Sequence, residues 1–479
     1  MQLDLQTIAE ALGQPCTAEA ADVLISRVVS DSREASCGTL FACIAGERVD
    51  GHDYAAQACG AGASAILAEH PLDGLAERFP NVAVFCVDDT IKALGRIARV
   101  WRDRFRGTVI GLTGTAGKTT TKEWLAAVLG VHAKVAKTEG NHNNQLGLPL
   151  SMLSADGDEK YWIFECGVSH AQDMDELGSI LHPDAAIVLN VGEGHTEGLG
   201  DKGVAWYKTR LFKYLAPNGL AAASADYADL VRCAKDVCPK VKFFSAAKEP
   251  FASAEDIVSS VQHKEENLYT AAVTCEGKTV QQDVHLPLTG PAAAENLACL
   301  AAVCSMLHVD LADIEKGLAE VSVPGHRFRR IEAGSCRIID DCYNANPLSM
   351  SRMLAAAHEE AMQKTDGRLL LVLGCMGELG SLEAEAHRRL GRQIKELAPM
   401  GVFWKGGCAD KVLEGLGSGI PFAVFSGDEE LCTAAGKLMQ DLGTTPSRAH
   451  CTLLCKGSRS NHLETAVLAL EKLFGAESD

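Results

Sequence analysis

Residues 107–130 decide the fold of this chain and read GTVIGLTGTAGKTTTKEWLAAVLG. The stretch begins with an apolar run typical of a buried parallel strand, continues through a glycine-rich turn and ends in an amphipathic helix. The apolar face of that helix consists of Trp124, Leu125, Val128 and Leu129, and Gly130 is suited to end it. A strand, a glycine loop and a helix in this order predict an α/β fold with a mostly parallel sheet.

The loop between the strand and the helix has the residues of a phosphate-binding loop. Gly114 and Gly117 let the backbone approach a ligand, and the helix N-terminus supplies unpaired N–H groups that favour phosphate oxygens. Lys118 can reach terminal phosphates, and the Thr119 hydroxyl can complete a Mg²⁺ shell. Leu112 stands where the full pattern has a glycine. We favour this interpretation over an ordinary glycine-rich turn, because the loop follows an apolar strand and precedes an amphipathic helix.

Length and charge narrow the class of protein. The 479 residues suggest about three domains of roughly 150 residues each. With 45 basic and 63 acidic residues, the formal net charge is −18, which argues against a nucleic-acid partner, because phosphate backbones are held mainly by Lys and Arg. An anionic ligand therefore needs a local positive site.

The cysteines and the N-terminus predict a cytoplasmic protein. Eighteen cysteines are scattered without any C-x-x-C pair, which indicates reduced thiols. The start, MQLDLQTIAEALG, carries an acidic residue where a signal peptide needs basic ones. No apolar run approaches the ~18 residues of a membrane span, so we expect no membrane partner.

Three domains are predicted. Residues 1–106 mix short strands and helices and form a small α/β domain, residues 107–322 form the central P-loop domain, and residues 323–479 form a Rossmann-like α/β domain. In the central domain, YWIFEC (161–166) and AAIVLNV (185–191) are further buried strands, whereas residues 268–288 resemble an antiparallel hairpin.

Two polar residues follow strands of the central domain. Glu165 closes the strand YWIFE, and His195 lies in the loop VGEGHTEG after the strand AAIVLN. Open α/β sheets bind ligands at the carboxyl ends of their strands, so both residues are candidates for a site beside the P-loop. A capping or solvated glutamate and a structural loop histidine are the alternatives.

Lys208 occupies an unusual position in the predicted helix GVAWYKTRLFKYL. A period of 3.6 residues places Val204, Leu211, Phe212 and Leu215 on one stripe with Lys208 in its middle. The lysine either extends its ammonium to water or is a partly desolvated amine with a lowered pKa, able to react or to pair with phosphates.

Together these motifs resemble the Mur ligase family, the cytoplasmic ATP-dependent enzymes that build the peptidoglycan stem peptide. The resemblance runs nearly end to end. It rests on GTAGKTT (114–120), GNHNNQLGLPL (140–150), Glu165, the His195 loop, the lysine helix, PGHRF (324–328) and KGSR (456–459). DDCYNANPLSM (340–350) and VLGCMGELG (372–380) resemble the members that add D-alanyl-D-alanine to UDP-N-acetylmuramoyl-tripeptide, which would be the small-molecule substrates.

The resemblance implies ATP and Mg²⁺ as cofactors. ATP would be held by Gly114, Thr115, Ala116, Gly117, Lys118, Thr119 and Thr120. Thr119 would bind one Mg²⁺, and Glu165, His195 and Lys208 would bind a second, with Lys208 converted to a carbamate by CO₂. Such an anionic oxygen ligand suits hard Mg²⁺. Lys118, His195, Lys208 and Arg327 would be the catalytic residues.

The remaining contacts are implied in the same way. Asn296 would contact adenine, Arg327 would reach the ATP phosphates from the third domain, and Asp341 would contact the nucleotide. The substrate contacts would be Ser30, Asp31, Ser32, Arg33, Asp50, Gly51, His52, Asn144, Asn344 and Asn346. Four positions depart from the family pattern: Ala116 replaces Asn, Ala292 and Ala293 replace a His-Asn pair, and Cys375 replaces Asp.

The implied reaction is amide formation through an acyl phosphate. A substrate carboxylate attacks the γ-phosphate of ATP, and the amine then displaces phosphate. Arg327 and the P-loop belong to different domains, so the domains would close about a hinge near residues 323–325, in a chain expected to act as a monomer. A ligase resembling folylpolyglutamate synthase, a diaminopimelate-adding ligase and a nucleotide-dependent switch stay open as alternatives.

Overall fold

The computed structural model describes residues 1–16, 20–194, 198–319, 321 and 325–476. His195 and residues 323 and 324 of the expected hinge lie outside the described residues. Within the described ranges, no helix combines the length and apolar composition needed to cross a membrane. We call the predicted segments 1–106, 107–322 and 323–479 the first, central and third domains.

The first domain carries a parallel sheet of four strands in the order β3-β4-β5-β6. A separate antiparallel pair, β1-β2, lies beside α1. The elements are β1 (Leu3–Asp4), α1 (Leu5–Leu12), β2 (Leu24–Ile25), β3 (Arg27–Val29), β4 (Thr39–Ala42), α2 (Ala55–Gly60), β5 (Ala65–Ala68), α3 (Leu75–Arg78), β6 (Ala83–Cys86) and α4 (Thr90–Arg104).

The central domain carries a nine-stranded sheet in the order β15-β14-β13-β12-β11-β10-β7-β9-β8. Its elements are β7 (Thr108–Thr113), α5 (Lys118–Gly130), β8 (Val135–Lys137), α6 (Gly147–Ser154), β9 (Tyr161–Glu165), α7 (Asp173–Leu181), β10 (Ala185–Val188), α8 (Val204–Thr209), β11 (Leu220–Ser224), α9 (Ala228–Val237), β12 (Lys242–Ser245), β13 (Ile257–Glu265), β14 (Leu268–Cys275), β15 (Lys278–His285), α10 (Pro291–Met306) and α11 (Ala312–Leu318).

The order of this sheet positions the site. The P-loop strand β7 runs parallel between β9 and β10, with Leu112 paired to Glu165 and Thr113 paired to Val188. The carboxyl ends of these three strands therefore meet beside the P-loop, as the sequence predicts.

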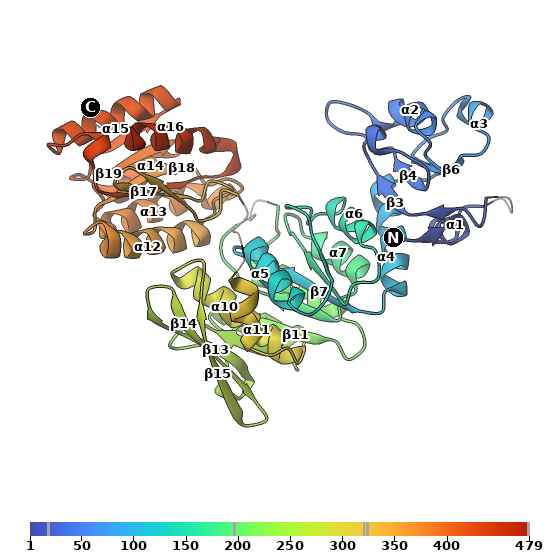
Figure 1. Cartoon of the computed structure of the whole chain (residues 1–479), viewed down its shortest axis with the longest axis horizontal. Coiled ribbons are helices and arrows are strands. Elements are labelled where there is room, and N and C mark those ends of the chain that lie inside the picture. Colours follow the sequence, from blue (N-terminus) through green and yellow to red (C-terminus); the bar gives the residue numbers. More distant parts are fainter. Residues whose placement is uncertain (17–19, 195–197, 320, 322–324, 477–479) are drawn as a thin grey trace.

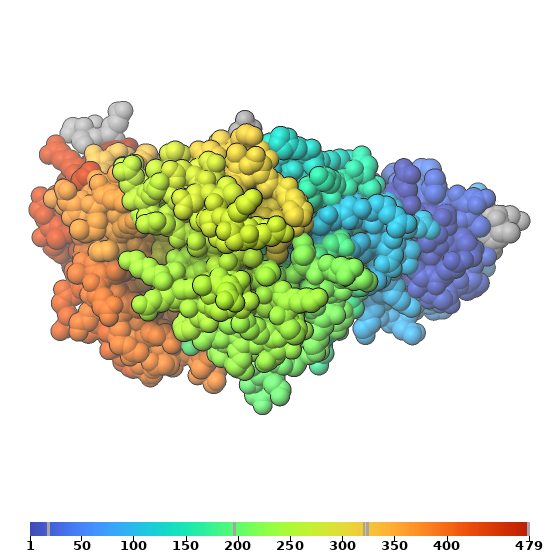
Figure 2. Space-filling view, turned by 90° about the horizontal axis from the view of Figure 1, so that it is seen from below, coloured from blue at the N-terminus to red at the C-terminus, as the bar shows by residue number. Residues whose placement is uncertain are grey.

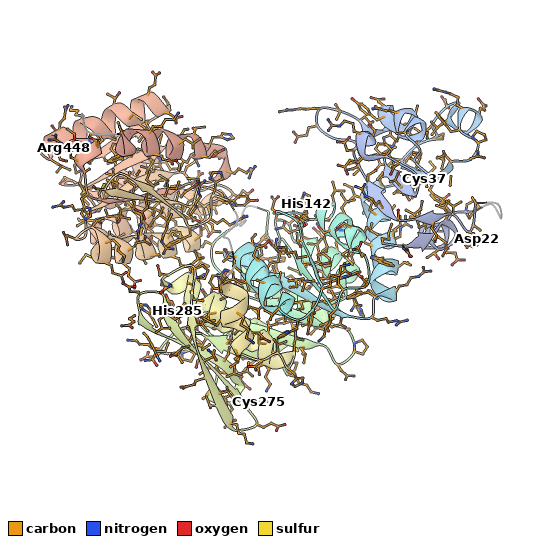
Figure 3. The ribbon with its side chains drawn as sticks, viewed as in Figure 1. Asp22, Cys37, His142, Cys275, His285 and Arg448 are labelled. Atoms are coloured by element: carbon orange, nitrogen blue, oxygen red, sulfur yellow. The ribbon has the colours of Figure 1, made fainter. Side chains whose placement is uncertain are left out.

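The predicted antiparallel hairpin is confirmed in β14 and β15, whose turn residues Glu276 and Gly277 both have positive φ, as a two-residue hairpin turn requires. Figure 3 shows Cys275 at the tip of this hairpin, on the side of the central domain away from the other two domains.

The third domain carries a six-stranded sheet in the order β16-β17-β21-β18-β19-β20, parallel except for the β16–β17 pair. Its elements are β16 (Arg329–Ala333), β17 (Cys336–Asp340), α12 (Pro347–Lys364), β18 (Leu369–Gly374), α13 (Glu383–Leu397), β19 (Gly401–Lys405), α14 (Ala409–Leu416), β20 (Phe422–Phe425), α15 (Asp428–Asp441), β21 (Thr452–Lys456) and α16 (Glu464–Gly475). The expected α/β fold, with a P-loop central sheet and a Rossmann-like C-terminal part, is confirmed.

The central domain separates the other two, which lie at opposite ends of the long axis (Figures 1 and 2). The apolar core continues from the central into the third domain, because Ala293 of α10 belongs to the same cluster of buried side chains as Met353 and Ala356 of α12. The third domain is thus packed against the P-loop side of the central domain rather than tethered by the linker alone.

One element differs from its prediction. The sequence predicts a single helix over residues 203–215, but the α-helix ends at Thr209 and continues as a 3₁₀ helix over Arg210–Tyr214. Lys208 lies in the last turn of the α-helical part, and Leu211 and Phe212 are buried as expected.

Candidate active site

A cavity of about 300 Å³ lies where the central domain meets the third. It brings together most of the predicted nucleotide, metal and third-domain residues. Those that line it are Thr115, Ala116, Gly117, Lys118, Thr119, Thr120, Glu165, Lys208, Asn296, Arg327, Asp341, Asn344 and Asn346. Residues as far apart in the sequence as Thr115 and Lys456 therefore face a single space.

The P-loop has a backbone conformation that favours glycine at position 117. Gly117 has φ +80°, and a Cβ there would lie 3.0 Å from Asn296 Oδ1. Helix α5 begins directly after it, at Lys118, so the helix N-terminus opens into the cavity. Lys118 Nζ donates to the Gly114 carbonyl at 2.8 Å, and burial lowers the pKa of this lysine.

Asn190 holds the P-loop backbone and was not singled out from the sequence. Its Oδ1 accepts hydrogen bonds from the backbone N–H groups of Thr115 (3.0 Å) and Ala116 (2.9 Å), and its Nδ2 donates to the Ala116 carbonyl (2.9 Å). Ala116 is held through its backbone, so the loop keeps its shape without the asparagine usual in the family. The signal for Asn190 was its place after β10, at the same sheet edge as Glu165.

Glu165 is buried beside the P-loop, with 1% of its surface exposed. Its Oε1 lies 3.5 Å from Nζ of Lys122, and Asn143 Nδ2 donates to its Oε2 at 3.5 Å. Lys122 is itself fully buried and donates to the Thr138 carbonyl at 2.6 Å. The sequence analysis missed this lysine, although its place one turn after Lys118 in α5 was a signal.

Lys208 does not extend to water. Only 3% of its surface is exposed, and it lines the cavity together with Lys118 and Glu165. Burial, together with the nearby Lys118 ammonium, lowers the pKa of Lys208 well below its usual value. The snorkelling alternative is therefore wrong, and the desolvated-amine alternative describes this residue.

The donor set fits a hard divalent cation. No described group forms a hydrogen bond to Glu165 Oε1, a buried carboxylate oxygen, and Lys208 and Thr119 line the same cavity. Carboxylate and hydroxyl oxygens are ligands that Mg²⁺ accepts.

The third domain presents Arg327 to this cavity from a strained turn. The flanking residues His326 and Phe328 have φ of +57° and +51°, a region that non-glycine residues seldom occupy. The guanidinium carbon of Arg327 lies 3.6 Å from the centre of the Tyr343 ring, which fixes its direction. Arg327 also contributes to the lowered pKa of Lys118, so the two cations face the same space.

Other third-domain residues are fixed around Arg327. Asp341 accepts from the Phe328 backbone N–H at 3.0 Å and from buried Lys456. Asn344 accepts from the Ala345 N–H at 2.8 Å. Asn346 caps α12 and donates from Nδ2 to the Thr115 carbonyl at 3.3 Å, which links the third domain directly to the P-loop.

The structure shows which groups surround Asn296, the residue expected to contact adenine, and which surround the residues that depart from the family pattern. Asn296 is buried, and its Oδ1 has no hydrogen-bond partner among the described residues. Ala292 and Ala293 line the same cavity, so small apolar side chains stand where the family has a polar pair. The Cys375 thiol contacts Asn461 Oδ1 at 3.3 Å.

The first-domain candidates and Asn144 do not line this cavity. Arg33 forms an ion pair with Asp31, and its side chain is largely exposed. Ser30 and Glu34 on the same segment are exposed as well, whereas Ser32 is buried. Asp50, Gly51 and His52 follow one another in the first domain. The Nδ1 of His52 donates to Asp50 Oδ1 at 2.6 Å, and its Nε2 accepts from the Glu69 N–H. Asn144 Oδ1 accepts from the Gly147 N–H at 2.8 Å, whereas its neighbours Asn141 and Asn143 line the cavity.

The loop that carries Asn141, Asn143 and Asn144 lies on the side of the central domain that faces the other two domains. Figure 3 shows His142 of this loop there. A ligand that reached from the first domain to the cavity would therefore pass this loop.

A phosphate-binding loop, a buried carboxylate and amine, and an arginine presented by a second α/β domain define a nucleotide-dependent enzyme. Comparisons with known proteins give the particular family. Three family descriptions match successive parts of the chain: Mur ligase family, catalytic domain (residues 24–102), Mur ligase middle domain (112–305) and Mur ligase, glutamate ligase domain (326–445). This chain belongs to the Mur ligase family.

Individual relatives and solved structures support the same family. The UDP-N-acetylmuramoyl-tripeptide–D-alanyl-D-alanine ligase of Escherichia coli is 32% identical over 459 residues, which cover 95% of each chain. A crystal structure of MurF from Acinetobacter baumannii has a TM-score of 0.83 at 28% identity, over 98% of this chain and 99% of that one. MurF from Thermotoga maritima, solved in complex with ADP, has a TM-score of 0.77 at 28% identity, over 94% and 97%.

Proposed function

We propose that this protein is the ATP-dependent ligase that joins D-alanyl-D-alanine to UDP-N-acetylmuramoyl-tripeptide in peptidoglycan precursor synthesis. The observation that carries the proposal is the single cavity in which the P-loop, Glu165, Lys208 and Arg327 meet. The end-to-end similarity to ligases of this activity supports the choice of substrates.

The triphosphate of ATP occupies the helix N-terminus of α5. Backbone N–H groups of the loop and the Lys118 ammonium hold its oxygens, and Gly117 allows their approach. Asn296, whose buried Oδ1 has no hydrogen-bond partner among the described residues, would contact the base. Arg327 and Asp341 complete the nucleotide site from the third domain.

One Mg²⁺ would be held by Thr119, and a second would be held by Glu165, Lys208 and His195. When bound, the two ions would offset the negative charge of the phosphates and of the attacking carboxylate. The neutral amine is the form of lysine that captures CO₂, and the lowered pKa of Lys208 favours that form at neutral pH. The resulting carbamate would turn a badly placed cation into an oxygen ligand.

The reaction follows from these positions. A carboxylate oxygen of the tripeptide attacks the γ-phosphorus, the bond to the β–γ bridging oxygen breaks, and ADP leaves. The amine of D-alanyl-D-alanine then attacks the acyl carbon, and inorganic phosphate departs with the original carboxylate oxygen. Lys118 and Arg327 lower the repulsion between the two anions of the first step. Packing of the third domain on the P-loop excludes water that would hydrolyse the acyl phosphate.

We also propose the remaining assignments. Ser30, Asp31, Ser32, Arg33, Asp50, Gly51 and His52 would bind the uridine nucleotide, and Asn144, Asn344 and Asn346 would contact substrate. The domain boundaries stay as predicted from the sequence. We also propose that the protein is a cytoplasmic monomer, as expected from the sequence, and the scattered cysteines, without any C-x-x-C pair, fit a reducing compartment.

Product analysis tests the proposed function. The protein is incubated with ATP, Mg²⁺, UDP-N-acetylmuramoyl-tripeptide and D-alanyl-D-alanine, and the products are identified by mass spectrometry. We expect a UDP-pentapeptide and one ADP per product. Replacing either the acceptor or the tripeptide by the corresponding substrate of a diaminopimelate-adding or folate ligase should abolish ADP release. Continued ADP release in the absence of any amine substrate would contradict the proposal.

A further inference from the structure

A buried ion pair joins the central and third domains beside the cavity. Glu295 of α10 has 2% of its surface exposed, and its Oε2 lies 2.7 Å from an NH2 nitrogen of Arg352 on α12. Only 12% of the Arg352 side chain is exposed. Tyr227 hydrogen bonds to both partners, donating to Glu295 Oε1 at 2.9 Å and accepting from Arg352.

The same carboxylate reaches the P-loop through one more side chain. Glu295 Oε2 accepts from Asn190 Nδ2 at 2.7 Å, and Asn190 holds the backbone of Thr115 and Ala116. An ion pair between Arg352 and Glu295 and hydrogen bonds from Glu295 through Asn190 thus connect the third domain to the P-loop. As an ionised carboxylate, Glu295 can accept from all of these donors at once.

The other ion pairs between these domains differ in burial. Among the described residues, three more cross from the central to the third domain: Glu193–Arg389, His263–Glu359 and Glu266–Lys364. Each has at least 36% of both side chains exposed, so water and salt screen it. The Glu295–Arg352 pair is screened much less, and its buried charges tolerate few other arrangements.

We propose that Glu295 and Arg352 are positioning residues, which set the third domain against the P-loop so that Arg327 and Asn346 face the transferring phosphate. The inference rests on the proposed function, since it assigns these residues to the phosphoryl-transfer step. Arg352 lines the cavity and Glu295 does not, and the Arg352 guanidinium is engaged by Glu295 and Tyr227. The P-loop and Lys118 bind nucleotide from the central domain, whereas the pair fixes what the third domain adds to the transition state.

Steady-state kinetics of Arg352→Met test the inference. We expect kcat to fall about 100-fold while the KM for ATP and the Kd for ADP change less than about 3-fold, because the misplaced groups act on the transition state. Arg352→Lys, which keeps the charge, should recover at least about a tenth of the wild-type kcat. The double variant Glu295→Gln/Arg352→Met should be no slower than the slower single variant, because both lesions break one interaction.

Arg389→Met is the matched control, because it removes an exposed ion pair across the same interface. Its kcat should stay within about 2-fold of wild type. A wild-type kcat in Arg352→Met, a loss confined to KM, an equal loss in Arg389→Met or multiplying losses in the double variant would each overturn the inference. If Arg352→Met does not fold, the double variant, which leaves no unpaired charge, takes its place in the comparison.

A second readout separates this inference from the proposed function. Small-angle scattering of wild type and Arg352→Met with ADP and Mg²⁺ needs no ligase substrates. We expect a larger radius of gyration in the variant, and identical scattering would contradict the inference. Absence of pentapeptide from the wild-type protein would instead contradict the proposed function.

Discussion

At the scale of single residues, Lys208 is the clearest case of chemistry that packing alone does not explain. Burial of its amine destabilises the fold, yet Lys208 lines the cavity together with Glu165. Lys208→Met should therefore lower ligase activity about 100-fold or more while leaving the thermal midpoint equal to or above that of the wild type. Steady-state assays and thermal unfolding of both proteins check this. A variant that is active or markedly less stable would contradict it.

The lowered pKa of Lys208 also predicts a pH dependence of stability. Between that lowered pKa and the usual value of about 10.4, the unfolded chain binds a proton at Lys208 that the native state does not. The free energy of unfolding of the wild type, measured in CO₂-free buffer, should therefore rise with pH in this window relative to Lys208→Met. Parallel curves for the two proteins would show that the amine is not desolvated.

Lys122 is expected to stabilise the buried carboxylate of Glu165 by its positive charge. Lys122→Met removes the cation that lies 3.5 Å from the buried Glu165 carboxylate and 3.1 Å from Glu123, and it should lower the free energy of unfolding by about 3 kcal/mol. Mg²⁺ with ADP should restore part of the lost stability, because a cation again faces the carboxylate. Thermal unfolding with and without Mg²⁺–ADP measures both effects, and an exposed lysine such as Lys134, replaced in the same way, is the control. Equal loss in both variants would contradict the role of Lys122.

At the scale of elements, the sequence predicts most strands of the parallel sheets, because buried parallel strands are continuous apolar runs. The hairpin at Glu276 and Gly277 is predicted for a similar reason, since its turn chemistry is local. The end of α8 at Thr209 was not predicted, because the change to a 3₁₀ helix keeps the same apolar stripe buried. Periodicity does not separate these two forms over so few residues.

The candidate site was predicted where it depends on a local motif and missed where it depends on tertiary pairing. The P-loop residues follow one strand directly and Glu165 ends another, so their common sheet edge could be inferred. Asn190, Glu295 and Arg352 come from three segments, and only the folded chain brings them together. Nothing local distinguishes Arg352 from a solvated arginine on a helix.

The turn before α5 gives a prediction about backbone geometry. Gly117→Ala introduces a Cβ 3.0 Å from Asn296 Oδ1 at a residue with φ +80°. We expect a loss of about 1–3 kcal/mol in the free energy of unfolding and at least a tenfold rise in the Kd for ADP. Calorimetric titration and denaturant unfolding measure these quantities. Gly130→Ala, at the far end of the same helix with nothing within 4 Å, is the control and should bind ADP normally.

At the scale of the whole molecule, the ATP cavity belongs to the central and third domains, and the uridine-nucleotide candidates lie in the first. The two sets should therefore respond separately to substitution. Arg33→Ala should raise the KM for UDP-N-acetylmuramoyl-tripeptide about tenfold, because an exposed guanidinium that can pair with phosphate is lost. The Kd for ADP should stay unchanged. If the KM for the tripeptide and the Kd for ADP changed together, the assignment of the two ligands to different domains would be contradicted.

The central claim is that ATP, held between these two domains, activates the tripeptide carboxylate as an acyl phosphate. The most direct measurement uses UDP-N-acetylmuramoyl-tripeptide labelled with ¹⁸O in the reacting carboxylate, followed by mass analysis of the phosphate released in the presence of D-alanyl-D-alanine. The account predicts one ¹⁸O atom in each inorganic phosphate and the other in the new amide. Phosphate free of label, formed together with the pentapeptide, would contradict it.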